Sequence, residues 1–141
     1  MIDFSGFGCV NCRKMEASVW TDPKVKQMLE NDYVLITLMV DDKTKLPQPI
    51  EIQENGKTRK LKTIGDKWSY LQRSKFGSNA QPFYILLNDE GQPLGPSYAF
   101  NEDCFQIHPV PSKRIERIQE RTTIKQTEGR VLPCLFLLQS L

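Results

Sequence analysis

The sequence lacks the long apolar run of a membrane-spanning helix and the excess of one charge that marks many nucleic-acid-binding proteins. No segment of its 141 residues approaches about 18 consecutive apolar residues, and the N-terminus lacks the basic-then-apolar pattern of a signal peptide. The 19 Lys and Arg nearly balance the 17 Asp and Glu, which leaves a net charge of +2. We therefore expect one soluble domain that does not bind nucleic acid.

Cysteine and histidine are scarce as well. Four cysteines are too few for a disulfide-dense secreted scaffold, and only Cys9 and Cys12 are closely spaced. Cys104 and His108 have the spacing of a metal-binding pair and would complete a Cys3His zinc site with the first two thiols. Cys134 lies in an apolar stretch, where a cysteine packs, is disordered with its segment, or forms a crosslink if exposed.

Strand and helix patterns alternate from the N-terminus onward. Residues 2–7 are largely apolar and predict a short buried strand, and residues 9–19 predict a helix that is entered through Ser-Gly-Phe-Gly. Thr21, Asp22 and Pro23 predict the start of a second short helix or a kinked continuation of the first. Residues 33–40, YVLITLMV, are apolar on both alternations, which predicts a central strand that is covered on both faces and parallel to the first.

The next segments complete a fold prediction. Residues 43–65 are polar and predict an inserted surface hairpin around Glu-Asn-Gly-Lys, and Asp66 is expected to cap a helix up to about Phe76. Residues 79–98 predict a strand, a tight turn and a second strand. Strands separated by helices pair in parallel and a hairpin pairs antiparallel, so this order predicts an α/β thioredoxin-like fold: a central mixed sheet with a closing antiparallel hairpin, flanked by helices.

The C-terminal part of the chain differs from the rest. Residues 104–141 carry six Lys or Arg against three Glu, and prolines interrupt their periodicity. We expect a thioredoxin-like domain over residues 1–103, followed by a basic tail that is poorly ordered and dispensable for redox chemistry. The apolar stretch at 131–138 would either fold back on the sheet or drive self-association.

A Cys-X-X-Cys motif between a strand and a helix is typical of disulfide exchange. Such an exchanger needs one exposed thiol of lowered pKa and a second thiol close enough to resolve the mixed disulfide. Cys9 lies at the predicted helix N-terminus, where free N–H groups and the helix dipole favour a thiolate, so we expect it to attack and Cys12 to resolve. Gly6 and Gly8 permit the tight turn before it. The alternatives are half of a zinc site or a packed cysteine pair.

The stretch over residues 2–16 carries a family resemblance. Its sequence, IDFSGFGCVNCRKME, resembles the thioredoxin motif and, more closely, the C-terminal thioredoxin-like domain of DsbD-type thiol:disulfide interchange proteins. The motifs WTDPKV, VDD, QPFY and DEGQPLG add to the similarity over about residues 2–103, and the insertion before GDKWSYLQRSKFG resembles Bacteroides-type members. The family's preceding strand, helix and membrane region are absent, and its closing helix is not evident, which predicts an N-terminally truncated domain with an atypical tail.

This resemblance implies a function and a setting. The domain would be an electron-relay disulfide reductase, of the kind linked to cytochrome c biogenesis, at the periplasmic end of an inner-membrane protein. It would need no cofactor beyond the redox-active Cys9–Cys12 disulfide. Its partners would be protein thiols, namely a membrane electron-donor domain and a further thiol domain that receives the electrons.

Two carboxylates are candidate catalytic residues beside the cysteines. Asp3 lies six residues before Cys9, the spacing at which thioredoxins keep a buried carboxylate beneath the resolving cysteine, so a raised pKa would suit it to take the Cys12 proton. Glu16 lies on the same helical face as Cys12 and matches a family glutamate that would share this proton. The alternatives are a surface Asp on an edge strand and a solvated helix Glu.

Four further residues are candidate substrate-binding residues by the same resemblance. Pro82 would be the cis-proline that faces the cysteine pair, with the Gln81 backbone turned outward toward an extended substrate. Phe7 and Gly8 occupy the place where thioredoxins usually carry a Trp beside the nucleophile, although a packed Phe is equally consistent with the sequence.

Two other classes of function stay open from the residues alone. One is a metal-binding structural or interaction module, and the other is a thioredoxin-fold binding module without redox activity. Asp41 and Asp42 follow the predicted central strand and are interpreted as a turn at its end.

Overall fold

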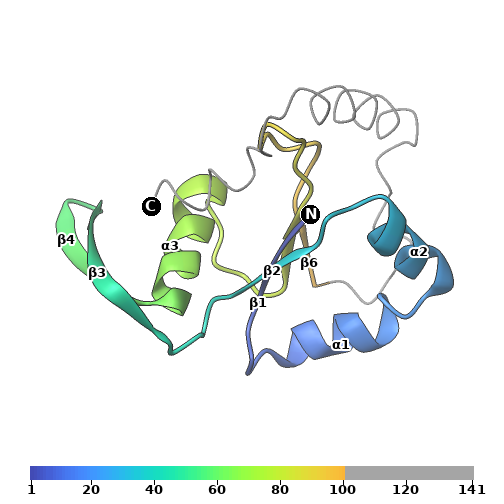
Figure 1. Ribbon diagram of the computed structural model, residues 1–141, viewed down its shortest axis with the longest axis horizontal. Helices are drawn as coiled ribbons and strands as arrows, with labels where there is room; N and C mark the ends of the chain where they lie inside the picture. The colour runs from blue at the N-terminus through green and yellow to red at the C-terminus, as the bar shows by residue number, and fades with distance from the viewer. Residues whose placement is uncertain (101–141) are drawn as a thin grey trace.

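The sheet is built around β1 (Ile2–Ser5) in a computed structural model that describes residues 1–100 (Figure 1). β1 pairs in parallel with β2 (Ile36–Met39) and antiparallel with β5 (Phe83–Ile85), and β6 (Tyr98–Ala99) pairs antiparallel with β5. The strand order is β2-β1-β5-β6. The predicted mixed sheet, parallel at one side and closed by antiparallel strands at the other, is confirmed.

Helices cover both faces of this sheet. α1 (Val10–Ser18) and α2 (Pro23–Asn31) lie on one side, and α3 (Ile64–Phe76) lies on the other (Figure 1). The start of α2 is as predicted, with proline in the first turn and the Asp22 side chain accepting hydrogen bonds from the N–H groups of Lys24 and Val25.

The cap of α3 corrects one prediction. The N-cap is Thr63, whose hydroxyl oxygen accepts the Asp66 N–H, while the Asp66 carboxylate accepts the Thr63 N–H. Asp66 is therefore the third helical residue of a capping box, because a carboxylate there satisfies the free N–H groups from inside the first turn.

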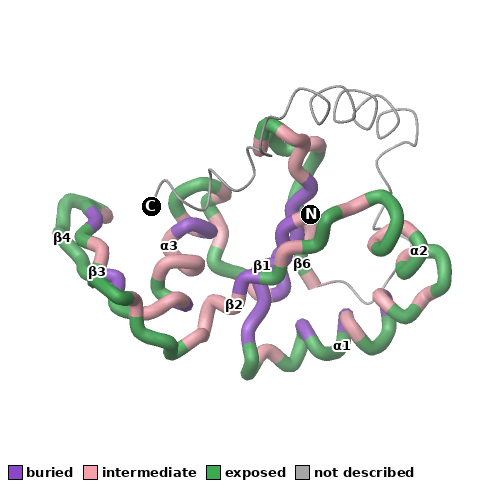
Figure 2. Tube along the Cα trace, viewed as in Figure 1, coloured by how far each residue is buried: buried purple, intermediate pink, exposed green. Residues whose placement is uncertain are grey.

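The alternation of β1 divides the interior into two parts. Ile2 and Phe4 pack toward α3, in a buried cluster with Leu38, Leu71, Phe83 and Ile85. The opposite face of the sheet carries Tyr84, which clusters with Met15 and Val19 of the α1 segment. Figure 2 shows the buried positions concentrated along the central strands. Because successive side chains of a strand point to opposite faces, Asp3 and Ser5 lie on the α1 side.

β2 is an edge strand, which corrects the prediction of a central one. It spans Ile36–Met39 rather than 33–40, it pairs only with β1 among the described residues, and Leu38 is its only buried residue. Val34 is 71% exposed. β1 and β5 take the two central positions, and an apolar pattern on both alternations does not distinguish a central strand from an edge strand whose flanks are uncovered.

The polar insertion forms the predicted hairpin. β3 (Lys45–Glu54) and β4 (Lys57–Thr63) pair antiparallel as a separate two-stranded sheet that lies beyond α3 (Figure 1). Asn55 and Gly56 both have positive φ, as a two-residue hairpin turn of type I′ requires. The Arg73 side chain of α3 contacts the Glu54 carboxylate at 2.9 Å, which fixes the hairpin to the helix.

Some predictions fall outside the described part of the chain. Cys104, His108 and Cys134 all lie beyond residue 100, as does the whole predicted tail, 104–141. Within residues 1–100, no helix is both long enough and apolar enough to span a membrane.

The start of α3 packs tightly against the end of β2, and this contact generates a stability prediction. A Cβ on Gly65 would lie 2.6 Å from the Val40 carbonyl oxygen and 2.7 Å from the Asp42 backbone nitrogen. Ala is normally preferred over Gly inside a helix, but here the obstructing atoms are backbone and cannot rotate away. We expect Gly65→Ala to lower the free energy of unfolding by roughly 1–3 kcal/mol.

Denaturant unfolding of the purified chain measures this effect. Gly95→Ala is the matched control, because a Cβ there meets no atom within 4 Å. An unfolding free energy for Gly65→Ala equal to that of the control would contradict the packing argument.

Candidate active site

The two cysteines of the motif lie at the junction of a tight turn and α1. The Cys9 N–H donates to the Gly6 carbonyl oxygen at 3.2 Å, which closes the turn directly after β1. Cys9 is the N-cap of α1, and its Sγ accepts the Cys12 N–H at 3.1 Å. The two sulfurs form a disulfide across a Cα–Cα distance of 5.3 Å. The predicted strand at 2–7 therefore ends earlier, at Ser5, because the turn needs Gly6.

The two sulfur-bearing residues differ in exposure. Cys9 is partly exposed, whereas Cys12 is 1% exposed on the inner side of α1. Phe7 and Val10, which flank Cys9, are each 68% exposed. Cys9 is therefore accessible from solvent beside two exposed apolar side chains, whereas Cys12 is not accessible from solvent. Phe7 is solvent-facing, so the alternative of a packed Phe does not hold.

Asp3 is buried on the α1 side of β1. It is 1% exposed, and burial raises the pKa of its carboxyl group to about 6. A hydrogen bond with the Thr37 side chain and the Arg13 charge oppose this rise in pKa, while the Glu16 charge adds to it. The Asp3 Oδ1 atom has no hydrogen-bond partner. A carboxyl group with a free oxygen and a pKa near neutrality is suited to take up and release a proton.

Glu16 is connected to the buried face of β1 through Arg13. The Arg13 guanidinium contacts the Glu16 carboxylate at 2.7 Å and donates from its second Nη to the Ser5 hydroxyl at 3.2 Å. Ser5 is fully buried, so Arg13 reaches from the surface of α1 down to β1. The electrostatic effect of Glu16 on both Asp3 and Tyr84 places its charge within reach of the buried face.

Tyr84 is a polar residue of this face that sequence reasoning did not single out. It lies opposite Asp3 in the sheet register, and its ring packs against Trp20 with the centroids 6.0 Å apart. Burial, followed by the charges of Asp3 and Glu16, raises the pKa of its hydroxyl group, so Tyr84 stays neutral. The sequence signal that could have indicated Tyr84 is its polar hydroxyl group within an otherwise apolar strand.

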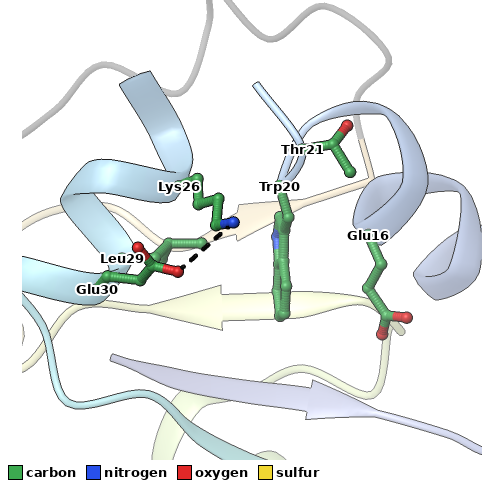
Figure 3. Close-up of a pocket in the computed structure, with 6 residues that line it drawn as sticks. All are labelled: Glu16, Trp20, Thr21, Lys26, Leu29 and Glu30. Carbon is green, nitrogen blue, oxygen red and sulfur yellow. Dashed lines mark ion pairs between the residues drawn. The ribbon is translucent and has the colours of Figure 1, made fainter. Parts of the chain in front are cut away.

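Glu16 also borders an open groove between α1 and α2. The groove has a volume of about 360 Å³, and Trp20 and Leu29 supply its apolar lining. Figure 3 shows Lys26 and Glu30 paired at its far side, 3.9 Å apart, with the Glu16 carboxylate turned away from them. Neither cysteine lines the groove, so it is separate from the disulfide.

Gln81 and Pro82 lie at the same end of the sheet as the cysteines. Phe83 pairs opposite Phe4, and β5 runs antiparallel to β1, so the loop that ends at Pro82 adjoins the end of β1. The Gln81–Pro82 peptide bond is cis, and Pro82 is fully buried. The buried Gln72 side chain donates to the Ala80 carbonyl oxygen at 2.7 Å and accepts from the Gln81 side chain at 3.0 Å, which fixes this loop to α3.

Asp41 contacts the turn before Cys9, which the interpretation of Asp41 and Asp42 as a strand-end turn missed. The N–H groups of Phe7 and Gly8 donate to its two carboxylate oxygens at 2.8 Å and 3.0 Å. The hydrogen bond from Gly8 lowers the pKa of Asp41 most, burial opposes this effect, and the hydrogen bond from Phe7 lowers the pKa further. Nothing in the local sequence indicates this contact, because it joins residues more than thirty positions apart.

The metal alternative depends on residues outside the described range. Within residues 1–100, no group of three or more His, Cys, Asp or Glu side chains is placed to hold a metal ion. Cys104 and His108, the predicted second half of a zinc site, lie beyond that range.

Comparison with known proteins agrees with this geometry. The thioredoxin-like domain family matches residues 1–107. The chain belongs to the thioredoxin-like domain family. No curated protein matches this thioredoxin-like chain significantly. A thioredoxin-like domain with a disulfide between cysteines three residues apart supports thiol:disulfide oxidoreductase activity as its general class.

The raised pKa of Asp3 in this thioredoxin-like domain generates a pH prediction. The folded-state pKa of about 6 exceeds the usual 3.8, so the folded state retains a proton that the unfolded state has lost. The resulting stability is present at low pH and is lost as pH rises through about 6, which lowers the free energy of unfolding by up to about 3 kcal/mol. We expect Asp3→Asn to remove this loss, because the amide does not ionise.

Unfolding of the disulfide form, measured from about pH 4 to pH 8, tests the prediction. Asp32→Asn, at an exposed position after α2, serves as the control for loss of one carboxylate. Parallel pH profiles for the wild type and Asp3→Asn would contradict the assignment.

Proposed function

We propose that this chain is a protein-disulfide reductase in which Cys9 attacks and Cys12 resolves. One observation carries the proposal: a partly exposed Cys9 at a helix N-terminus is joined to a buried Cys12, on the side of α1 that faces a buried carboxyl group of raised pKa. The exposed sulfur is the one a partner can reach, and the helix N-terminus stabilises its thiolate. Asp3 and Glu16 are the proposed proton carriers.

The reaction proceeds in two displacements. The Cys9 thiolate attacks one sulfur of a partner disulfide, so that a mixed disulfide forms and the other partner sulfur leaves as a thiolate. Cys12 gives its proton to the ionised Asp3 and attacks the Cys9 sulfur, which releases the second partner sulfur as a thiolate and closes the Cys9–Cys12 disulfide. Two electrons pass from the dithiol to the partner, and an outside dithiol donor must restore the reduced form.

The proposed setting is an electron relay of the DsbD type. The motif around the cysteines supports it, together with the fold and the hairpin inserted before α3. In this setting a membrane domain supplies the electrons, a further thiol domain receives them, and the domain faces the periplasm. We propose Phe7, Gly8 and Gln81 as residues that contact the partner, because they lie around the exposed side of Cys9 or at the same end of the sheet. The buried Pro82 would act through its cis peptide bond, which sets the direction of the Gln81 backbone.

Single cysteine variants test the roles of the two thiols. We expect Cys9→Ser to abolish disulfide exchange, because Cys12, the other cysteine within residues 1–100, is buried. We expect Cys12→Ser to accumulate a mixed disulfide with the partner, because attack still occurs and resolution does not. The measurement is reduction of a model protein disulfide, with nonreducing electrophoresis to detect the adduct.

Two controls separate this function from metal binding. Thiol counting before and after reduction should show a gain of two thiols, and metal content should not change when the thiols are blocked. Equal trapping by both single variants would overturn the assignment of roles, and release of zinc on blocking would favour the metal-binding module instead.

The extent of the catalytic unit is also a proposal, with residues 1–103 sufficient for exchange. Every residue assigned above, from Asp3 to Tyr84, precedes the tail. We expect a chain truncated after Asp103 to keep the exchange rate of the full chain within about twofold, since no assigned proton carrier or thiol is lost. Exchange assays and thermal unfolding of both forms measure this. Lost exchange with unchanged stability would show that the tail contributes to the chemistry, with Cys104 and His108 as the first residues to substitute.

A further inference from the structure

We propose that Asp41 is a positioning residue for the Cys9–Cys12 dithiol, which holds the turn carrying Cys9 ready for closure of the disulfide. The inference rests on the proposed function, because it concerns the same exchange reaction. The carboxylate binds the turn at two points, with Oδ1 accepting the Phe7 N–H at 2.8 Å and Oδ2 accepting the Gly8 N–H at 3.0 Å. These are the two residues immediately before Cys9, so their position determines where the Cys9 backbone lies and thus where its sulfur is placed.

The contact between Asp41 and the turn depends on Gly6 having no side chain. A Cβ on Gly6 would lie 3.1 Å from Asp41 Oδ2 and 3.2 Å from Asp41 Cγ, closer than an undisturbed contact allows. The carboxylate therefore packs against the bare α-carbon of Gly6. The N–H groups that bind the carboxylate also lower the pKa of Asp41, so it remains a charged acceptor at neutral pH.

Asp41 is itself held by two layers of the fold. The Val40 N–H before it donates to the Ser5 carbonyl oxygen of β1 at 2.9 Å, and the Gly65 N–H of α3 donates to the Asp42 carbonyl oxygen at 3.0 Å. Its side chain thus connects the turn to a fixed part of the protein. A group held on both sides in this way can transmit a defined position to a reactive residue.

The step that depends on Asp41 is the second displacement. In the closed form, the disulfide itself ties Cys9 to Cys12. In the dithiol and in the mixed disulfide that tie is absent, and the position of the Cys9 sulfur beside Cys12 then depends on the turn before Cys9 and on the start of α1 after it. When the Cys12 thiolate attacks, the Cys9–Cys12 bond forms, the bond from Cys9 to the partner breaks, and the partner sulfur leaves with the electron pair. Restraint of the turn raises the effective concentration of one sulfur at the other and favours this closure.

Asp41→Asn in the full-length chain tests the proposal, with Asp42→Asn as the matched control. An amide at position 41 keeps one acceptor oxygen and turns an NH2 group toward the second N–H donor. Asp42 makes its side-chain hydrogen bond elsewhere, accepting the Thr44 N–H through Oδ1 at 2.8 Å, and an Asn there keeps that oxygen. The two variants therefore lose the same formal charge one residue apart, but only one of them loses a bond to the turn.

Two measurements report closure directly. One is the equilibrium between the Cys9–Cys12 disulfide with two glutathione thiols and the dithiol with glutathione disulfide. The other is the rate at which a preformed mixed disulfide between Cys9 and glutathione resolves. We expect Asp41→Asn to shift the equilibrium toward the dithiol by roughly threefold to tenfold and to slow resolution by a similar factor. Asp42→Asn should stay within about twofold of the wild type, because its own acceptor oxygen is retained.

A second substitution tests the contact from the other side. Gly6→Ala should displace the Asp41 carboxylate and shift the equilibrium in the same direction, but it should add no shift in an Asp41→Ala background, where the obstructing oxygens are gone. Thermal unfolding of each variant separates loss of position from loss of fold.

The outcomes distinguish this inference from the proposed function. If the wild-type chain exchanges and Asp41→Asn matches Asp42→Asn, the positioning role is wrong and the reductase assignment stands. Additive effects of Gly6→Ala and Asp41→Ala would also overturn the positioning role. If the wild-type dithiol does not exchange with glutathione, the proposed function fails, and the role of Asp41 fails with it.

Discussion

The structure depends on the tight turn that converts β1 into α1. Within the few residues after Ser5, the chain leaves the middle of the sheet, reverses, and presents Cys9 as the N-cap of a helix. The helix N-terminus supplies free N–H groups, one of which, from Cys12, already points at the Cys9 sulfur. Cys9 is partly exposed because, as the N-cap, it lies just outside the helix, whereas Cys12 lies within α1 on its buried side.

The strand before the turn determines what lies beneath the cysteines. Phe4 of β1 enters the apolar cluster against α3, so the residues on either side of it must face α1. Those residues are Asp3 and Ser5, both buried. A strand with one polar face is unfavourable in the middle of a sheet unless its polar groups find hydrogen-bond partners, because burying an unpaired polar group costs free energy. Arg13 satisfies Ser5, whereas Asp3 keeps one oxygen without a partner and a raised pKa.

The sequence predicted what depends on local pattern and missed what depends on distant contacts. The Cys-X-X-Cys helix, the cap at Asp22 and the hairpin turn at Asn55 and Gly56 are set by neighbouring residues, and each was predicted. The edge position of β2 was not, because a run of apolar residues carries no record of which strands pair beside it. Asp41 lies at the site because it accepts hydrogen bonds from the turn before Cys9, and Tyr84 lies there because it pairs opposite Asp3 in the sheet. No short window of sequence contains either contact.

The pKa values of Asp3 and Asp41, two carboxyl groups near the cysteine motif, are shifted in opposite directions, and the difference follows from their surroundings. Asp41 lies at the surface end of β2 and accepts two backbone N–H groups, so its charged form is stabilised and its pKa falls. Asp3 lies under α1 with few donors, so burial dominates and its pKa rises to about 6. A group that must hold a backbone turn needs a constant charge, whereas a group that exchanges protons with a thiol needs both protonation states within reach at neutral pH. The sheet supplies both conditions around the segment that carries Cys9, because Asp41 follows an edge strand and binds the turn before Cys9, whereas Asp3 lies on the inner face of the central strand that leads into that turn.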